Sequence, residues 1–224
     1  MQPSIPLTGK QTPELIHKTP LIPSGPRRIL CVGSSGSGKT YGLLSLIPSL
    51  ASLKAVAIFA KVQDQLAPVY ESIQKYCKAN KIDYSISSEI DPEIIRALAG
   101  KKGHKLVIVD DFSTGEQELL VPLYSRGRHH QISVIDLCQN PYMAHKDIRN
   151  NSNTYIIYSL GATNQLNALA SALSPVMDND TFKRAYRAAT AKKYTPLVVF
   201  MDAPAPLQIR QGFDRFLAER LKKR

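Results

Sequence analysis

The segment GSSGSGKT at residues 33–40 contains the residue types that bind a phosphate chain. It fits the pattern GxxxxGK[ST] and lies between an apolar stretch typical of a strand and a segment of helical composition. Its glycines let backbone N–H groups converge on a phosphate, and the following helix N-terminus favours negative charge. In this pattern Lys39 bridges the β- and γ-phosphates and Thr40 binds Mg²⁺. The segment therefore predicts a site for ATP and Mg²⁺. The predicted nucleotide contacts are Gly33, Ser34, Ser35, Gly36, Ser37, Gly38, Lys39, Thr40 and Tyr41.

Two adjacent acids follow the apolar run LVIV and supply the second half of such a site. Asp110 and Asp111 stand at the carboxyl end of a strand predicted over 105–111. An Asp at this position holds magnesium in phosphate-loop hydrolases. We expect Asp110 to be the metal carboxylate and Asp111 to orient or deprotonate the attacking water. In a chain without the phosphate loop, such a pair would as readily cap a helix.

Gln139 closes the next predicted strand, over 131–139. A polar residue at this strand end can contact the γ-phosphate and report its loss, and an ordinary loop amide is the alternative. Asp136 lies inside the same strand, where a charge is costly unless it is paired. The compensation that the sequence suggests is an ion pair with a basic residue of a helix.

Two arginines, Arg126 and Arg128, lie between these strands at the end of a predicted helix. An arginine there can reach the γ-phosphate of a neighbouring subunit, a contact worth about 10³ to 10⁵ in rate. For each of them a surface or DNA-facing position is the alternative. Arg149 is a further candidate for a subunit or phosphate contact. His129 and His130 lack metal-ligand spacing, and we expect them to pack or to cap a helix.

Stretches rich in β-branched residues alternate with helical segments along the chain. Strands are predicted over 28–32, 55–62, 83–86, 105–111, 131–139, 154–160 and 196–203. Helices are predicted over 41–47, 66–80, 92–100 with Asp91 as N-cap, and 115–127 with Pro122 in the first turn or at a kink. Strands that are apolar on both faces and alternate with helices predict an α/β fold, in which a mostly parallel sheet is covered on both sides.

Three regions are predicted along the chain. Residues 1–26 hold six of the fifteen prolines and form a proline-rich arm. Residues 27–205 form the core with the phosphate loop. Residues 206–224 form a basic amphipathic helix, because Phe213, Phe216, Leu217 and Leu221 fall on one helical stripe.

The composition narrows the class of protein. The 224 residues carry 29 Lys+Arg against 18 Asp+Glu, a net charge of +11, and 43% are hydrophobic. Such a chain can bury a core, and its charge favours polyanionic partners. Three separate cysteines favour thiols in a reducing compartment. No stretch approaches the roughly 18 unbroken apolar residues of a membrane span, and no signal peptide is recognisable. We therefore expect a protein of the cytosol or nucleus.

The order of the motifs resembles one family, the viral DNA-packaging ATPases of the FtsK-HerA superfamily. The resemblance covers about residues 28–160 and includes GSSGSGKT and LVIVDDF. More specific is the block RGRHHQISVIDLCQN, which is followed by IRNNSNTYIIYS. The phosphate loop alone is shared by many folds, whereas this second block is not.

This resemblance implies a RecA-like core, a homo-oligomeric ring, and ATP-driven translocation of double-stranded DNA into a preformed viral capsid. By position it implies that Lys39 and Thr40 bind nucleotide and metal, Asp110 is the metal carboxylate, Gln139 the sensor, and Arg128 or Arg126 the arginine finger. The implied partners are duplex DNA and capsid or vertex proteins, at assembly sites in the host cytoplasm or nucleus or in the virion. One departure concerns Asp111, because cellular relatives of this family usually carry Glu at that position.

Two other functions are compatible with the phosphate loop. A nucleoside or nucleotide kinase would need a substrate-binding acid or arginine at the second strand and an arginine-rich lid. That strand ends in Lys61, and no such lid is recognisable. An ATP-dependent DNA-binding scaffold is the other alternative, although the paired acids favour hydrolysis.

Overall fold

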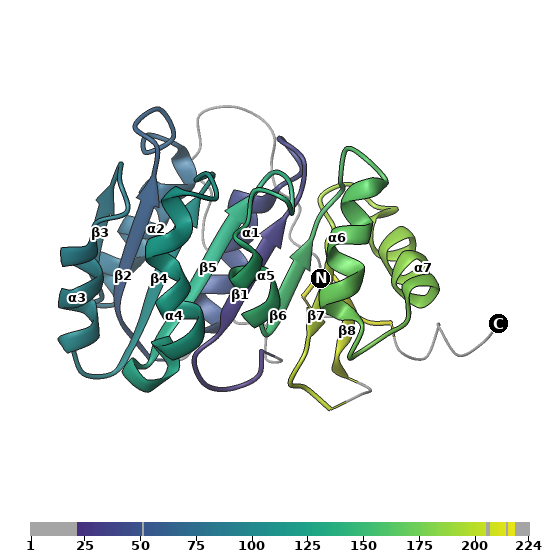
Figure 1. Cartoon of the computed structure of the whole chain (residues 1–224). Coiled ribbons are helices and arrows are strands. Elements are labelled where there is room, and N and C mark those ends of the chain that lie inside the picture. Colours follow the sequence, from purple (N-terminus) through teal and green to yellow (C-terminus); the bar gives the residue numbers. More distant parts are fainter. Residues whose placement is uncertain (1–21, 51, 205–206, 214, 218–224) are drawn as a thin grey trace.

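The computed structural model describes residues 22–50, 52–204, 207–213 and 215–217. They contain a nine-stranded sheet with the strand order β3-β2-β4-β5-β1-β6-β7-β8-β9 (Figure 1). The six strands from β3 to β6 in this order run parallel, and β7 to β9 continue the sheet antiparallel. The bounds are β1 Arg28–Val32, β2 Leu53–Ala60, β3 Asp83–Ser87, β4 His104–Asp110, β5 Ile132–Cys138, β6 Thr154–Ile157, β7 Leu197–Phe200, β8 Ile209–Gln211 and β9 Arg215–Phe216.

Helices cover both faces of this sheet (Figure 1). They are α1 Lys39–Leu46, α2 Pro68–Ala79, α3 Pro92–Gly100, α4 Val121–Arg126, α5 Lys146–Asn151, α6 Asn164–Leu173 and α7 Asn179–Thr190. Short 3-10 helices lie at Ile47–Ser49, Glu116–Leu120 and Gly127–His130. Apolar side chains of α1 and α2 pack on one face, and those of α3 to α7 pack on the other. Within the described residues, every helix falls short of the length and apolar character that crossing a membrane requires.

The fold class predicted from the sequence, a mostly parallel α/β sheet between helices, is confirmed. The predicted N-cap is present, because the Asp91 carboxylate accepts a hydrogen bond of 2.8 Å from the Glu93 N–H. The helix predicted over 115–127 is divided into a 3-10 turn and α4, since Pro122 lies in the first turn of α4. Helices α5, α6 and α7 have no counterpart among the predictions.

The amphipathic helix predicted over 206–224 is wrong for the part that the structure describes. Ile209–Gln211 and Arg215–Phe216 are strands β8 and β9, and the sheet therefore continues past residue 205. Ile209 and Leu217 bury their side chains against the core. A short apolar pattern of this kind fits a helix or a strand equally, and pairing with β7 decides the outcome. The basic end at 218–224 and the first 21 residues of the arm lie outside the described residues.

The parallel arrangement sorts the predicted site residues to two edges of the sheet. The carboxyl ends of β1, β4 and β5 lead into Gly33, Asp111 and Gln139 respectively. Arg126 and Arg128 precede β5 and therefore lie toward the opposite, amino-terminal edge. Phosphate loop, acids and amide are thus brought together, whereas the arginines lie apart from them.

Candidate functional site

The phosphate loop runs from the end of β1 to the start of α1. The Ser34 N–H donates to the Ser159 carbonyl at 2.9 Å, which attaches the loop to the chain after β6. Gly38, the residue before α1, has φ +101°, a backbone conformation that residues with a side chain rarely adopt. A Cβ on Gly33 would lie 2.6 Å from both Ser37 Oγ and Tyr158 Cβ. Both positions therefore require glycine.

Lys39 begins α1 and extends its side chain back across the loop. Its ammonium donates to the carbonyls of Gly33 at 2.6 Å and Ser34 at 3.1 Å. The side chain is largely buried. The cation is thus held over a backbone concavity at a helix N-terminus, where an anion is favoured by the N–H groups and by the helix dipole.

Thr40 and Asp110 meet across the sheet edge. The Thr40 hydroxyl donates to Asp110 Oδ2 at 3.2 Å, and the Tyr70 hydroxyl donates to the same oxygen. Burial raises the pKa of Asp110 above its ordinary value. Hydroxyl and carboxylate oxygens are the ligands that Mg²⁺ prefers. Two further buried atoms have no hydrogen-bond partner. They are Ser37 Oγ in the phosphate loop and Asp111 Oδ1 in the loop after β4. These residues fit a magnesium nucleotide.

Asp111 and Gln139 form the third part of the site. The Gln139 amide donates to Asp111 Oδ2 at 2.6 Å, and the Asp111 N–H donates to the Leu137 carbonyl at 2.9 Å. Asp111 has φ +61°, which marks a sharp turn at the end of β4. Both loops after β4 and β5 therefore hold polar side chains together at the edge where the phosphate loop ends.

Asp136 is fully buried in β5, and the ion pair expected for it is absent from the described residues. Its Oδ1 accepts a hydrogen bond of 3.3 Å from the Gln117 amide, and its Oδ2 has no hydrogen-bond partner. Burial, together with the negative charges of Asp110 and Asp111, raises the pKa of Asp136 to about 8. The carboxyl is therefore compensated by retaining its proton instead of by a basic partner.

This raised pKa predicts how stability depends on pH. An acid whose pKa is higher in the folded protein stabilises the fold fully below its ordinary pKa of 3.8, and the contribution is lost as pH rises toward 8. Asp136→Asn removes this dependence. Between about pH 5 and pH 8, its free energy of unfolding should rise relative to wild type by up to about 4 kcal/mol. Urea unfolding of both proteins across this range measures the difference, and a constant difference would contradict the prediction.

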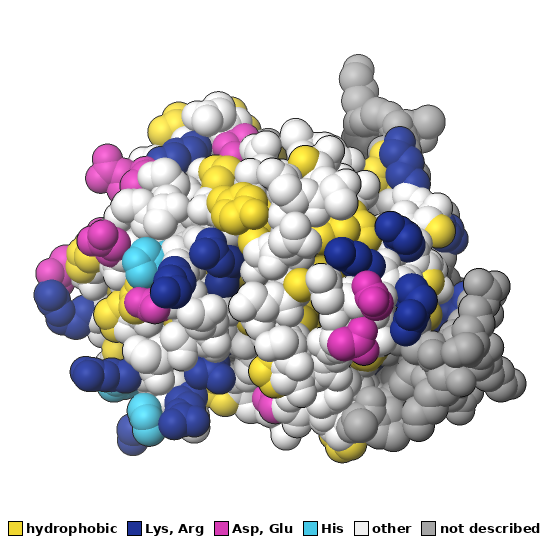
Figure 2. All heavy atoms as spheres, turned by 45° about the vertical axis from the view of Figure 1, so that its right-hand side comes forward, with side chains coloured by type: hydrophobic (Ala, Val, Ile, Leu, Met, Phe, Trp, Pro, Cys, Tyr) yellow, Lys and Arg dark blue, Asp and Glu magenta, His cyan; other side chains and the backbone are white. Residues whose placement is uncertain are grey.

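The predicted arginines are placed differently from the acids. Arg126 and Arg128 are exposed at the end of α4 and in the following 3-10 turn, next to exposed His129 and His130. In Figure 2, Lys, Arg and His side chains gather at the lower left of the molecule. Burial and the charge of Arg128 lower the pKa of Arg28. Within one chain, neither Arg126 nor Arg128 joins the phosphate loop.

Arg149, the weaker candidate, makes hydrogen bonds within its own chain. Its guanidinium donates to the carbonyls of Pro141 at 2.8 Å and Ala144 at 2.7 Å. These contacts fasten the connection between β5 and α5. These two bonds therefore hold the side chain against the segment that follows Gln139.

Several residues near the site carried no recognisable signal in the sequence. Tyr70 lies on the buried face of α2, where an aromatic residue is read as core. Tyr194, with φ +63°, would lie 3.2 Å from a Cβ on Gly38. Gln117 is fully buried beneath the loop after β4. Each acts through a contact between segments distant in sequence, which no local pattern encodes.

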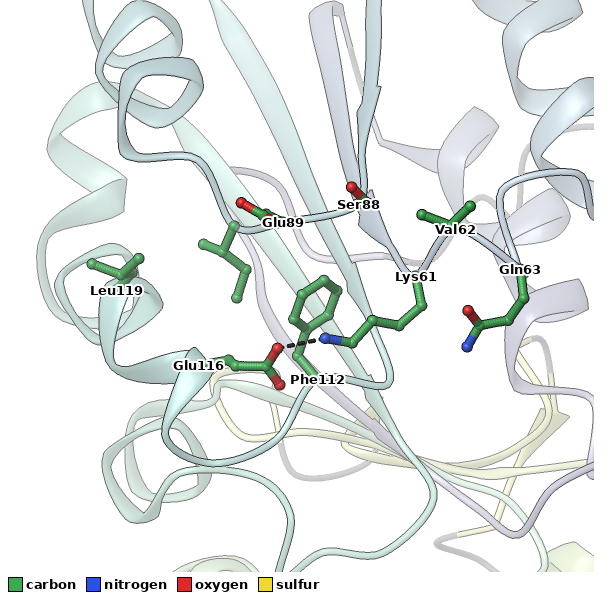
Figure 3. A pocket seen from close by; sticks show the side chains of 9 residues that line it. Lys61, Val62, Gln63, Ser88, Glu89, Phe112, Glu116 and Leu119 are labelled. Carbon is green, nitrogen blue, oxygen red and sulfur yellow. Dashed lines mark hydrogen bonds and ion pairs between the residues drawn. The ribbon is translucent and has the colours of Figure 1, made fainter.

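A cavity of about 510 Å³ lies beside the end of β2 (Figure 3). Lys61 extends along it, 4.0 Å from the centre of the Phe112 ring, and pairs with Glu116. Hydrogen bonds from Lys61 and from Ser113 lower the pKa of Glu116 to about 2. None of the predicted site residues lines the cavity, although Phe112 directly follows Asp111.

A strand, a glycine loop with lysine and threonine, and two acids at a neighbouring strand end define a P-loop NTPase. The chain belongs to the poxvirus A32 protein family, whose profile matches residues 19–190. It is 32% identical to the DNA packaging protein OPG160 of vaccinia virus (strain Copenhagen), and the match covers 51% of this chain and 46% of that protein. The monkeypox virus protein of the same name is also 32% identical, over 51% of this chain and 41% of its own length. The chain spans about half the length of the curated relatives it matches.

Solved structures show the same fold. The genome packaging NTPase B204 of Sulfolobus turreted icosahedral virus 2, in complex with ATP-gammaS, superposes with a TM-score of 0.58 at 15% identity. The match covers 79% of this chain and 93% of that protein. The AMP complex of the same NTPase gives a TM-score of 0.58 at 14% identity, over 83% and 96% of the two chains.

Proposed function

We propose that this protein is an ATP-hydrolysing motor that translocates double-stranded DNA into a preformed viral capsid. The observation that carries the proposal is the meeting of Lys39, Thr40, Asp110 and the Asp111–Gln139 pair at one edge of the sheet. Membership of the A32 family and the names of the packaging relatives support it. The site of action that follows is a virus assembly site in the host cell.

Each residue has a distinct role in this proposal. The loop from Gly33 to Tyr41 cradles the phosphates of ATP, and Lys39 stabilises the charge that develops on the γ-phosphate. Thr40 and Asp110 would hold Mg²⁺, which supplies charge neutralisation on the phosphate oxygens. Asp111 orients or deprotonates the attacking water. Gln139, already bonded to Asp111, detects the γ-phosphate and its loss.

The arginines belong to this mechanism only between subunits. Arg126 and Arg128 lie toward the amino-terminal edge of the sheet, while the phosphate loop lies at the carboxyl edge. A head-to-tail contact brings one edge of a subunit to the other edge of its neighbour, and repeated contacts of this kind form a ring when the rotation between subunits closes. We propose that Arg128 or Arg126 reaches the γ-phosphate of the neighbouring subunit as an arginine finger.

The grip on DNA is proposed to be electrostatic and independent of base sequence. The net charge of +11 supplies the cations, and each phosphate that is neutralised releases condensed counterions. Contacts to capsid or vertex proteins complete the proposed set of partners.

Duplex DNA binding should therefore weaken steeply with salt. We expect the logarithm of the affinity to fall linearly with the logarithm of salt concentration, with a slope of about −0.9 per neutralised phosphate. Fluorescence anisotropy of a labelled duplex, titrated at several NaCl concentrations, measures the slope. Two duplexes of unrelated sequence serve as controls and should give the same line. An affinity that hardly changes between low and physiological salt would contradict the electrostatic grip.

A further inference from the structure

The buried carboxyl of Asp136 lies at the centre of the sheet, close to the carboxylates of the site. In the register of the strands it stands opposite Val109 of β4 and Leu30 of β1. Val109 immediately precedes Asp110, and Asp136 itself lies three residues before Gln139. An apolar side chain at this position would avoid the cost of burying a carboxyl. The contribution of this carboxyl is therefore to be sought in the hydrogen bond that it accepts.

Gln117 is the hydrogen-bond partner of Asp136 and joins three segments. Its side chain is fully buried. Its amide nitrogen donates to Asp136 Oδ1 at 3.3 Å and to the Phe112 carbonyl at 3.0 Å. Its amide oxygen accepts from the His145 N–H at 2.8 Å. One side chain thus connects the loop after β4, strand β5 and the start of α5.

A second hydrogen bond joins the same two loops. The Thr114 hydroxyl donates to the Met143 carbonyl at 2.8 Å. The loop after β4 begins at Asp111, and the loop after β5 begins at Gln139. These two residues are themselves bonded at 2.6 Å. Gln117 and Thr114 therefore each connect the loop that carries Asp111 to residues of the segment that follows Gln139, and Asp136 accepts a hydrogen bond from the Gln117 amide.

We propose that Asp136 and Gln117 are positioning residues that hold Asp111 and Gln139 at the spacing needed for ATP hydrolysis. The proposal rests on the proposed function and names a part of its machinery outside the phosphate loop, the metal pair and the arginine finger. Neither side chain contacts the nucleotide in this role. Removing the bond between them leaves the ATP-binding residues in place and lets the two loops shift, and a misplacement of about 1 Å costs up to about 10²-fold in rate.

The test compares three variants of the full chain with wild type: Asp136→Asn, Asp136→Leu and Gln117→Met. Steady-state turnover gives kcat and KM for ATP, equilibrium titration with a fluorescent ATP analogue gives Kd, and thermal unfolding gives Tm. Asn keeps an acceptor for the Gln117 amide, so we expect Asp136→Asn to stay within about twofold of wild-type kcat. Asp136→Leu and Gln117→Met should lose about tenfold or more in kcat, with Kd nearly unchanged.

A double variant separates positioning from packing. If the two side chains act as one unit, Asp136→Leu combined with Gln117→Met should be no slower than the slower single variant. Wild-type kcat in a folded Asp136→Leu or Gln117→Met protein would overturn the inference and leave the proposed function intact. If Asp136→Leu does not fold, the folded Gln117→Met variant decides. Absence of turnover in the wild-type chain would instead overturn the proposed function, and this inference with it.

Discussion

Lys39→Ala is expected to reduce ATP turnover by about 10² to 10³-fold or more. The ammonium of Lys39 is held over the loop by the carbonyls of Gly33 and Ser34, at 2.6 and 3.1 Å. It is thus positioned before any phosphate arrives, and in the proposed mechanism it stabilises charge that develops during the reaction. Alanine removes the cation without altering the loop glycines. Phosphate release by the purified variant with Mg²⁺ and ATP measures the loss.

Lys61→Ala is the matched control for this prediction. Lys61 also lies at the carboxyl edge, beside β4, but it pairs with Glu116 and lines a separate cavity (Figure 3). Its loss should leave turnover within about twofold, because it touches no residue assigned to the phosphates. Equal losses in the two variants would show that the phosphate loop has no special role. Turnover in Lys39→Ala at the wild-type rate would contradict the assignment of the nucleotide site.

Arg128→Ala is expected to reduce DNA-stimulated turnover by about 10³ to 10⁵-fold if this arginine is the finger. The informative experiment mixes subunits, because the arginine and the phosphate loop of one chain lie at opposite edges of the sheet. Lys39→Ala subunits retain Arg128, and Arg128→Ala subunits retain Lys39. In an equal mixture, a neighbouring pair can rebuild an intact site, so up to about a quarter of wild-type turnover should return.

Arg126→Ala, tested in the same way, distinguishes the two candidates. The finger variant should be inactive alone and regain turnover in the mixture, whereas the other variant should retain turnover alone. Arg96→Ala is the matched control, because Arg96 is an exposed arginine on α3 that pairs with Glu93. Unmixed Arg96→Ala protein should keep wild-type turnover. If mixtures of Lys39→Ala with either arginine variant stay inactive, no arginine is supplied between subunits by these positions.

Much of this fold could be predicted from local patterns. The β-branched runs predicted β1, β2, β4 and β5, and their two-sided apolar character predicted parallel neighbours. Because parallel strands share one carboxyl edge, the grouping of Gly33, Asp110 and Gln139 followed from the order of the motifs. The N-cap at Asp91 could be predicted because its hydrogen bond joins residues only two positions apart in the sequence. These features depend on residues close in sequence.

Contacts between distant segments could not be predicted. Asp136 was expected to pair with a basic helix residue, whereas its partner is the neutral amide of Gln117. The apolar stripe of the tail predicts a helix, because such a pattern does not reveal that the edge of β7 is open for pairing. The bond of Tyr70 to Asp110 spans forty residues and is formed only when α2 packs on the sheet.

Steady-state ATP hydrolysis by the purified chain with Mg²⁺, with and without double-stranded DNA, tests the central claim most directly. A motor that works on DNA should hydrolyse ATP faster when duplex DNA is present, and the increase should disappear in Lys39→Ala and at high salt. Hydrolysis at the same rate with and without DNA, in a protein that binds both ATP and duplex DNA, would contradict the claim that this chain is a DNA-translocating ATPase.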